Sequence, residues 1–230
     1  MRSICIIPAR GGSKRIPRKN IKLFFGKPFL AHTALIASDA AIFDEIIVST
    51  DSVDVKEVCD DVGLRFSFPR PASLADDFSP VYEVMKYEIS KLSVEPTDII
   101  TCLYATSVLL DPLKLREAFK QHLSSKDVSY TFGVTQFPFP PQRGLLRSET
   151  GKVRMLDDSK FLTRSQDLPK IWHDTGTFYI GCVREWFAQP FTFNSNSIGY
   201  PLAHDEIQDI DNQDDWEMAE IKYLKKRKEI

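Results

Sequence analysis

Short apolar runs alternate along the chain with stretches in which apolar residues recur at helical spacing. The runs predict buried strands at 3–8, 45–49, 65–68, 99–104 and 177–180. The stretches between and after them predict helices at 29–38, 53–62, 80–92, 112–123 and 214–228. This alternation favours one α/β domain over residues 1–230, with a mostly parallel sheet covered by helices on both faces.

Capping residues predict where three of these helices begin. Asp51 and Ser52 precede the second helix, and their side chains are suited to accept from its first backbone N–H groups. Ser79-Pro80 and Asp111-Pro112 each place a capping side chain before a proline at the first helical position.

The pattern changes between about residues 136 and 172. The run Phe-Pro-Phe-Pro-Pro at 137–141 cannot form a central strand, because proline has no backbone N–H to donate. The rest of this segment is polar and rich in turn residues. We therefore expect an excursion from the main sheet, serving as a lid or as an oligomer contact.

Composition excludes several classes of protein. Hydrophobic residues make up 43% and charged residues 27% of the 230 residues, as in ordinary globular proteins. No apolar run approaches the roughly 18 residues of a membrane helix, and the first run is too short for a signal peptide, so a cytoplasmic protein is expected. A net charge of −2 argues against a polybasic nucleic-acid binder. The four cysteines form no C-x-x-C pair, which favours buried thiols over a metal or redox site.

Charge is nevertheless unevenly distributed. Residues 1–30 carry eight basic residues and no acid, whereas residues 204–220 carry eight acids and no Lys or Arg. The two ends are suited to a polyanion and to a divalent cation, although solvated surface is the favoured interpretation of an isolated charge run.

The segment at 9–20 follows the first predicted strand, and ligands of parallel sheets bind at the carboxyl ends of strands. Gly11 and Gly12 allow backbone N–H groups to approach an anion, Ser13 adds a hydroxyl, and Arg and Lys side chains add charge-assisted bonds. The segment is neither a P-loop nor a dinucleotide fingerprint. Its place at a strand end favours triphosphate binding over a flexible basic loop.

Further candidates come from single residues and one pair. Asp209 and Asp211 face the same side of an extended chain and are suited to hold Mg²⁺ together with substrate phosphates, or else form a solvated acidic turn. Arg70 suits a base or phosphate contact, or is a surface arginine. Arg164 is suited to bind a carboxylate through two hydrogen bonds. His173 is a candidate base, although a single histidine before a strand more often has a structural role.

These segments together resemble, in the same order, motifs of the acylneuraminate (nulosonate) cytidylyltransferases. Residues 9–20 are similar to the family's loop A-R-x-x-S-K-x-x-x-x-K-N, residues 49–52 to its S-T-D-S motif, and residues 70–77 to its R-P-x-x-L-A-x-D segment. Thr106-Ser107 lies where the family has Q-P-T-S-P, and 176–179 and 209–211 resemble its closing motifs. Residues 103–107 and 164–181 are most similar to the pseudaminic acid members. Tyr104-Ala105 replaces the Gln-Pro of the sialic acid members, which disfavours N-acetylneuraminate as substrate.

The resemblance implies a three-layer Rossmann-like nucleotidyltransferase fold and a role for each matching residue. For CTP it implies Arg10, Gly11, Ser13, Lys14, Lys19, Asn20, Arg70 and Ser79. For the sugar acid it implies Tyr104, Thr106, Arg164, Gln166 and Tyr179, and for Mg²⁺ Asp209 and Asp211. Arg10, Lys19 and Asp211 are the expected catalytic residues. The excursion is expected to form a homodimer and to close the sugar site across the interface.

The implied reaction is Mg²⁺-dependent transfer of CMP from CTP to a nine-carbon nulosonic acid, with pseudaminic acid favoured and pyrophosphate released. The same reaction on N-acetylneuraminic, legionaminic or 3-deoxy-octulosonic acid is the nearest alternative. A non-catalytic nucleotide-binding protein and a glycosyltransferase are the alternatives from other classes. The group that takes the hydroxyl proton is left open between Asp211, a metal-bound hydroxide and solvent.

Overall fold

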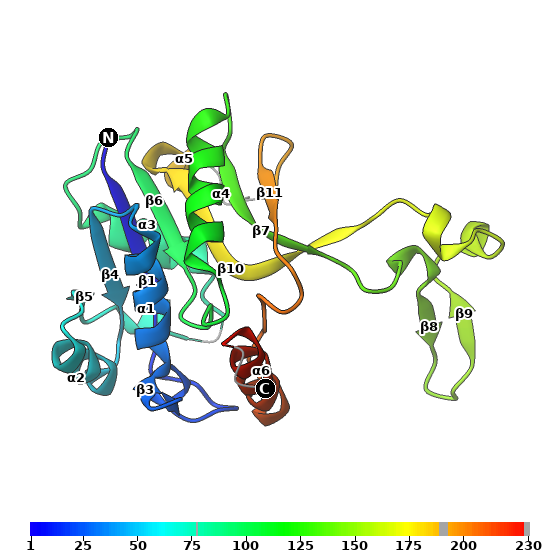
Figure 1. Cartoon of the computed structure of the whole chain (residues 1–230), viewed down its shortest axis with the longest axis horizontal. Helices are drawn as coiled ribbons and strands as arrows, with labels where there is room; N and C mark the ends of the chain where they lie inside the picture. Colours follow the sequence, from blue (N-terminus) through cyan, green and yellow to red (C-terminus); the bar gives the residue numbers. More distant parts are fainter. Residues whose placement is uncertain (77, 189–192, 228–230) are drawn as a thin grey trace.

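A central sheet organises the molecule. The computed structural model describes residues 1–76, 78–188 and 193–227. Within these residues seven strands form the sheet in the order β11-β7-β10-β6-β1-β4-β5 (Figure 1). Their bounds are β1 (Ser3–Pro8), β4 (Glu45–Ser49), β5 (Phe66–Ser67), β6 (Ile99–Leu103), β7 (Tyr130–Gln136), β10 (Trp172–Cys182) and β11 (Ile198–Pro201). The mostly parallel sheet is confirmed, since β1 pairs parallel with β4 and β6, whereas β10 runs antiparallel to β6 and β7.

Helices cover both faces, so the three-layer α/β prediction is confirmed. The helices are α1 (Phe29–Ala40), α2 (Val53–Val62), α3 (Val81–Ser90), α4 (Pro112–Ser124), α5 (Val183–Ala188) and α6 (Gln213–Lys226). Cys5 and Ile7 of β1 pack into the core under α1, α2 and α4, while Ile4 and Ile6 pack into the core under α3 and α5. Because successive strand residues face opposite sides, a strand buried on both faces is an unbroken apolar run. No helix within the described residues is long and apolar enough to cross a membrane.

Two of the three predicted caps are present. Ser52 accepts a hydrogen bond from the Val55 N–H, and Asp111 accepts from the Leu113 N–H. The prediction for Ser79 is wrong. Its hydroxyl donates to the Ser73 carbonyl and to Asp76 Oδ1, and α3 begins at Val81 without a side-chain cap. The predicted end of the last helix at Lys228 lies outside the described residues.

The chain leaves the sheet after Gln136 and returns at Trp172. Between them, β8 (Leu145–Arg147) and β9 (Val153–Met155) form an antiparallel hairpin, and the segment projects from the body as an arm (Figure 1). We call residues 137–171 the arm. The returning strand β10 starts five residues before the predicted Thr177, and its register shifts between Asp174 and Tyr179.

Shorter elements complete the chain. A small hairpin of β2 (Leu23–Phe24) and β3 (Lys27–Pro28) precedes α1. The 3-10 helices are η1 (Lys19–Ile21), η2 (Ala72–Leu74), η3 (Pro141–Arg143), η4 (Asp158–Lys160) and η5 (Ser165–Asp167). Phe24 and Phe29 pack against Trp216 of α6, which brings the C-terminal acidic segment next to the N-terminal basic segment.

Candidate active site

A cleft of about 360 Å³ opens at the carboxyl ends of the parallel strands. Four segments line it, namely the loop after β1, the segment between β5 and α3, the residues after β6, and the acidic segment before α6. Eleven of the residues predicted for the site lie on its wall: Arg10, Ser13, Lys14, Lys19, Asn20, Arg70, Ser79, Tyr104, Thr106, Asp209 and Asp211. Residues from distant parts of the sequence therefore meet where the fold class places ligands.

Direct contacts join the basic loop to the acidic segment. Lys19 Nζ donates to the Ile210 carbonyl at 2.5 Å, and Arg15 Nη2 pairs with Asp211 Oδ1 at 2.7 Å. The loop itself is braced by Asn20, whose amide donates to the Arg10 carbonyl at 2.9 Å. The acidic segment is thereby fixed against the loop that is suited to phosphate.

The surroundings of Asp209 disfavour its charged form, which an added cation would offset. Burial raises the pKa of Asp209, and the nearby Asp211 carboxylate raises it further, while Lys19 opposes both effects. Burial lowers the pKa of Lys19, and the two aspartates partly restore it. A half-buried carboxylate whose charge is disfavoured by a second carboxylate nearby belongs to a donor set that a divalent cation stabilises.

Magnesium fits this donor set. Asp209 and Asp211 supply carboxylate oxygens beside a cleft lined with basic and hydroxyl side chains that are suited to phosphate, and Mg²⁺ is usually held by one or two carboxylates plus substrate phosphates and water. Within the described ranges no cluster of three or more His, Cys, Asp or Glu side chains is placed to hold a metal alone. The two aspartates therefore suit a metal that arrives with a nucleotide.

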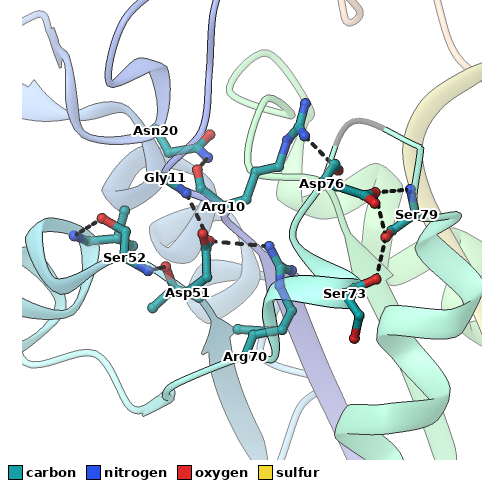
Figure 2. A network of polar contacts seen from close by, with 12 residues as sticks. Arg10, Gly11, Asn20, Asp51, Ser52, Arg70, Ser73, Asp76 and Ser79 are labelled. Carbon is teal, nitrogen blue, oxygen red and sulfur yellow. Dashed lines mark hydrogen bonds and ion pairs between the residues drawn. The ribbon is translucent and has the colours of Figure 1, made fainter.

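Arg70 forms the inner wall of the cleft (Figure 2). It is only 4% exposed, and its Nη2 lies 3.6 Å from Asp51 Oδ1. The same carboxylate oxygen accepts from the Gly11 N–H at 3.0 Å. Burial lowers the pKa of Arg70, and the carboxylates of Asp51 and Glu88 oppose this.

The loop after β1 also contacts the segment between β5 and α3. Arg10 Nη1 donates to the Asp76 carbonyl at 2.7 Å (Figure 2). Asp76 Oδ1 in turn accepts from the backbone N–H groups of Phe78 and Ser79 and from the Ser79 hydroxyl. Asp77, part of the predicted motif here, lies outside the described residues.

Tyr104 and Tyr179, both predicted for the sugar site, pack against each other at one side of the cleft. Tyr104 lines the cleft, whereas Tyr179 lies behind it with ring centroids 5.9 Å apart. The Tyr179 hydroxyl donates to Asp174 Oδ2 at 2.5 Å, and burial raises the pKa of both phenols. Tyr179 therefore supports the wall of the cleft in this chain without lining it.

Four other predicted residues do not line this chain's cleft. Arg164 and Gln166 lie on the arm, where Arg164 Nε pairs with Asp167 at 2.7 Å. The N–H of Gly11 is taken by Asp51. His173 contacts the Asp174 carbonyl through Nδ1 outside the cleft.

Sequence reasoning missed Arg15, Asp51 and Asp76. Asp51 was expected to cap a helix, yet the cap is Ser52 and the Asp51 carboxylate points to the loop after β1. Two signals identify it, namely the S-T-D-S motif at 49–52 and its position at the carboxyl end of β4. Arg15 lies in the basic segment at 9–20 that was expected at the site, but nothing in the local sequence marks it as the partner of Asp211. Nothing in the local sequence separates Asp76 from surface residues.

Solved structures with the same fold define the class of protein. CMP:2-keto-3-deoxy-manno-octonic acid synthetase, complexed with CTP, superposes with a TM-score of 0.74 at 15% identity, covering 98% of this chain and all 100% of its own. 4-diphosphocytidyl-2C-methyl-D-erythritol synthase gives 0.66 at 15% identity, covering 96% of this chain and 98% of its own. The chain thus has the nucleotidyltransferase fold.

Sequence similarity is more specific. Residues 4–218 match the family model described as cytidylyltransferase. Pseudaminic acid cytidylyltransferase of Campylobacter jejuni is 38% identical over 225 residues, which is 97% of each chain. N-acylneuraminate cytidylyltransferase of Streptococcus agalactiae is 30% identical over 94% of this chain and 52% of its own length. The chain belongs to the cytidylyltransferase family, and it is an enzyme of the nucleotidyltransferase class.

Proposed function

We propose that this enzyme transfers CMP from CTP to a nulosonic acid and releases pyrophosphate, and that the nulosonic acid is pseudaminic acid. The observation that carries the proposal is the meeting of the basic loop and the Asp209–Asp211 segment around one cleft. Reaction of a triphosphate requires both segments. Transfer of a nucleotidyl group is catalysed mainly by positioning the reactants and by neutralising the negative charge of the phosphates. The similarity to the Campylobacter enzyme supports the choice of sugar.

In the proposed reaction the anomeric hydroxyl of the sugar acid attacks the α-phosphorus of CTP. An O–P bond forms to the sugar, the bond to the β-phosphate oxygen breaks, and the hydroxyl proton is lost. Arg10, Ser13 and Lys19 line the cleft and are suited to bind the phosphates. Holding both reactants in one orientation supplies much of the rate enhancement.

Magnesium is proposed at Asp209 and Asp211. When bound there, it would neutralise charge that develops on the phosphate oxygens. The arginine of the Arg15–Asp211 pair holds the Asp211 carboxylate toward the basic loop. Lys19, tied to the Ile210 carbonyl between the two aspartates, fixes the segment and adds a positive charge to the site.

We further propose a homodimer built by the arm. Large apolar side chains on it are exposed, among them Phe139 at 82%, Phe161 at 66% and Leu162 at 89%. An exposed apolar segment of this size is typical of a protein–protein contact. Arg164 and Gln166 lie on the same arm away from their own cleft, so we propose that they complete the sugar site of the other copy. A cytoplasmic location is part of the same proposal.

A pyrophosphate-release panel tests the activity. It crosses four nucleoside triphosphates with pseudaminic, legionaminic, N-acetylneuraminic and 3-deoxy-octulosonic acids, with and without Mg²⁺ and with no acceptor glycan. We expect release only with CTP and Mg²⁺, fastest with pseudaminic acid, and a CMP-sugar by mass spectrometry. Faster turnover of another acid refutes the substrate choice, and no release with any pair refutes the proposed function.

Mixing two inactive variants tests the shared sugar site. Asp211→Ala removes the proposed metal ligand, and Arg164→Ala removes the arm guanidinium. If the arm serves the partner's cleft, one cleft of each mixed dimer holds both intact residues, and about a quarter of the activity returns after subunit exchange. No recovery, in a mixture shown to have exchanged subunits, places Arg164 in its own copy's site or in none.

A further inference from the structure

One carboxylate oxygen links two walls of the cleft. Asp51 Oδ1 accepts from the Gly11 N–H at 3.0 Å and lies 3.6 Å from Arg70 Nη2 (Figure 2). Gly11 belongs to the loop after β1, Arg70 follows β5, and Asp51 stands after β4 between them. A single side chain therefore sets the distance between the basic loop and the buried arginine.

The approach of the loop to this site is close. A Cβ atom at Gly11 would lie 2.6 Å from Ser52 Cβ, nearer than side-chain atoms come in proteins. Only glycine lets the loop backbone come within hydrogen-bond distance of Asp51 here. Loop and carboxylate are thus fitted to each other.

Arg70 is paired with a carboxylate, but one of its N–H donors lacks a hydrogen-bond partner among the described residues. Its side chain is almost fully buried and lines the cleft, and its Nε has no hydrogen-bond partner among the described residues. Burying an unpaired donor is costly, so the position of this guanidinium at the cleft needs a compensating interaction. The Asp51 carboxylate lies 3.6 Å from Nη2 and compensates the buried charge of the guanidinium, a group whose binding to two acceptors depends on its orientation.

We propose that Asp51 is a positioning residue for CTP binding, acting through Arg70 and Gly11. The inference rests on the proposed function, because CTP is taken as the ligand of the cleft. A role in starting α2 does not explain the contacts, since Ser52 provides that cap. The Asp51 carboxylate instead accepts one hydrogen bond from the loop after β1 and forms an ion pair with Arg70.

Asp51→Asn tests the inference, because asparagine keeps an acceptor for Gly11 and loses the charge that orients Arg70. We expect the Kd for CTP, measured by calorimetry without sugar acid, to rise about tenfold, as loss of one charge-assisted contact predicts. The KM for the sugar acid should stay within about twofold, which a general loss of structure would not allow. In an Arg70→Met background the same substitution should change the Kd little, because the two effects share one path.

Asp60→Asn is the matched control, since it removes an exposed carboxylate of α2 that pairs with Lys56. It should leave the Kd for CTP unchanged. If Asp51→Asn does not fold, Asp51→Glu replaces it. Glutamate keeps the charge but displaces the carboxylate by one methylene, so the Kd for CTP should rise because the contacts to Gly11 and Arg70 are both displaced.

Two results overturn the inference while the proposed function stands. If the wild type binds CTP and the Asp51 variant binds it with the same Kd, the positioning role of Asp51 is refuted but the proposed function is not. Equal losses for Asp51→Asn with and without Arg70 refute the path through that arginine. If the wild-type chain does not bind CTP, the proposed function fails, and the inference with it.

Discussion

Replacing Asp211 by alanine separates the chemistry of the site from its stability. Among the described residues the Asp211 side chain forms an ion pair with Arg15 at 2.7 Å, and the side chains of Asp211 and Arg15 are 41% and 69% exposed. Such an exposed pair contributes about 0–1 kcal/mol. The backbone N–H of Asp211 donates to Asp215, and alanine retains that bond.

The expected loss of stability is therefore below about 1 kcal/mol, or a fall in Tm of no more than about 4 °C. The expected loss of activity is far larger. Removing one carboxylate of a metal site costs on the order of 4 kcal/mol of transition-state stabilisation, which is about a thousandfold in turnover.

The assay combines calorimetric unfolding with CMP-sugar formation at saturating CTP and Mg²⁺. Asp214→Ala is the matched control, because Asp214 also carries an exposed carboxylate, in the first turn of α6. It should lose at most about 1 kcal/mol of stability through the helix dipole and keep its activity. Normal turnover by folded Asp211→Ala would refute the metal assignment.

Three further predictions concern the loop, the acidic pair and the buried core. Gly11→Ala places a Cβ 2.6 Å from Ser52 Cβ, so we expect a loss of about 1–3 kcal/mol in urea unfolding; Gly12→Ala, with no atom within 4 Å, should be stable, and equal losses would contradict the packing argument. The raised pKa of Asp209 means that its charge opposes folding, and the stability present at low pH is lost as pH rises through that pKa. Asp209→Asn should therefore not lower Tm at pH 7 without metal, while its turnover falls; a marked drop in Tm would contradict this. Burial lowers the pKa of His122 from 6.5 to about 4, so the stability present above pH 6.5 is lost as pH falls toward 4, by about 3 kcal/mol. Between pH 6.5 and 4, the free energy of unfolding of His122→Asn should fall by about 3 kcal/mol less than that of the wild type. The same pH dependence in both proteins would refute the lowered pKa of His122.

Local sequence predicted the strands of the parallel half of the sheet well. β4 has the predicted bounds, and so does β1, whose four consecutive apolar residues are buried on both faces. Ser52 and Asp111 cap the helices they precede, because capping depends only on N–H groups two or three residues away. Ser79 fails as a cap because the Asp76 carboxylate takes both its N–H and its hydroxyl.

The predicted site came partly from chemistry and partly from position. Residues 9–20 were placed at the cleft because they follow a strand, and the structure puts Arg10, Ser13 and Lys19 on its wall. The roles of these side chains stay predictions until ligand binding is measured. Arg164 and Gln166 were grouped with the site by resemblance, and their place on the arm follows from how β7 and β10 extend beyond the sheet.

The amino-acid sequence alone determined the class of fold, the capped helices, the proline-broken excursion and the two segments of opposite charge. Hydrophobic periodicity and capping act over a few residues, so they can be read along the chain. Tertiary packing decided the rest. Packing of Phe24 and Phe29 on Trp216 brought Lys19 to the Ile210 carbonyl across 191 positions, and the order of strands set Asp51 between Gly11 and Arg70. These contacts join residues far apart in the sequence, so they depend on how the whole sheet and α6 pack and not on local pattern.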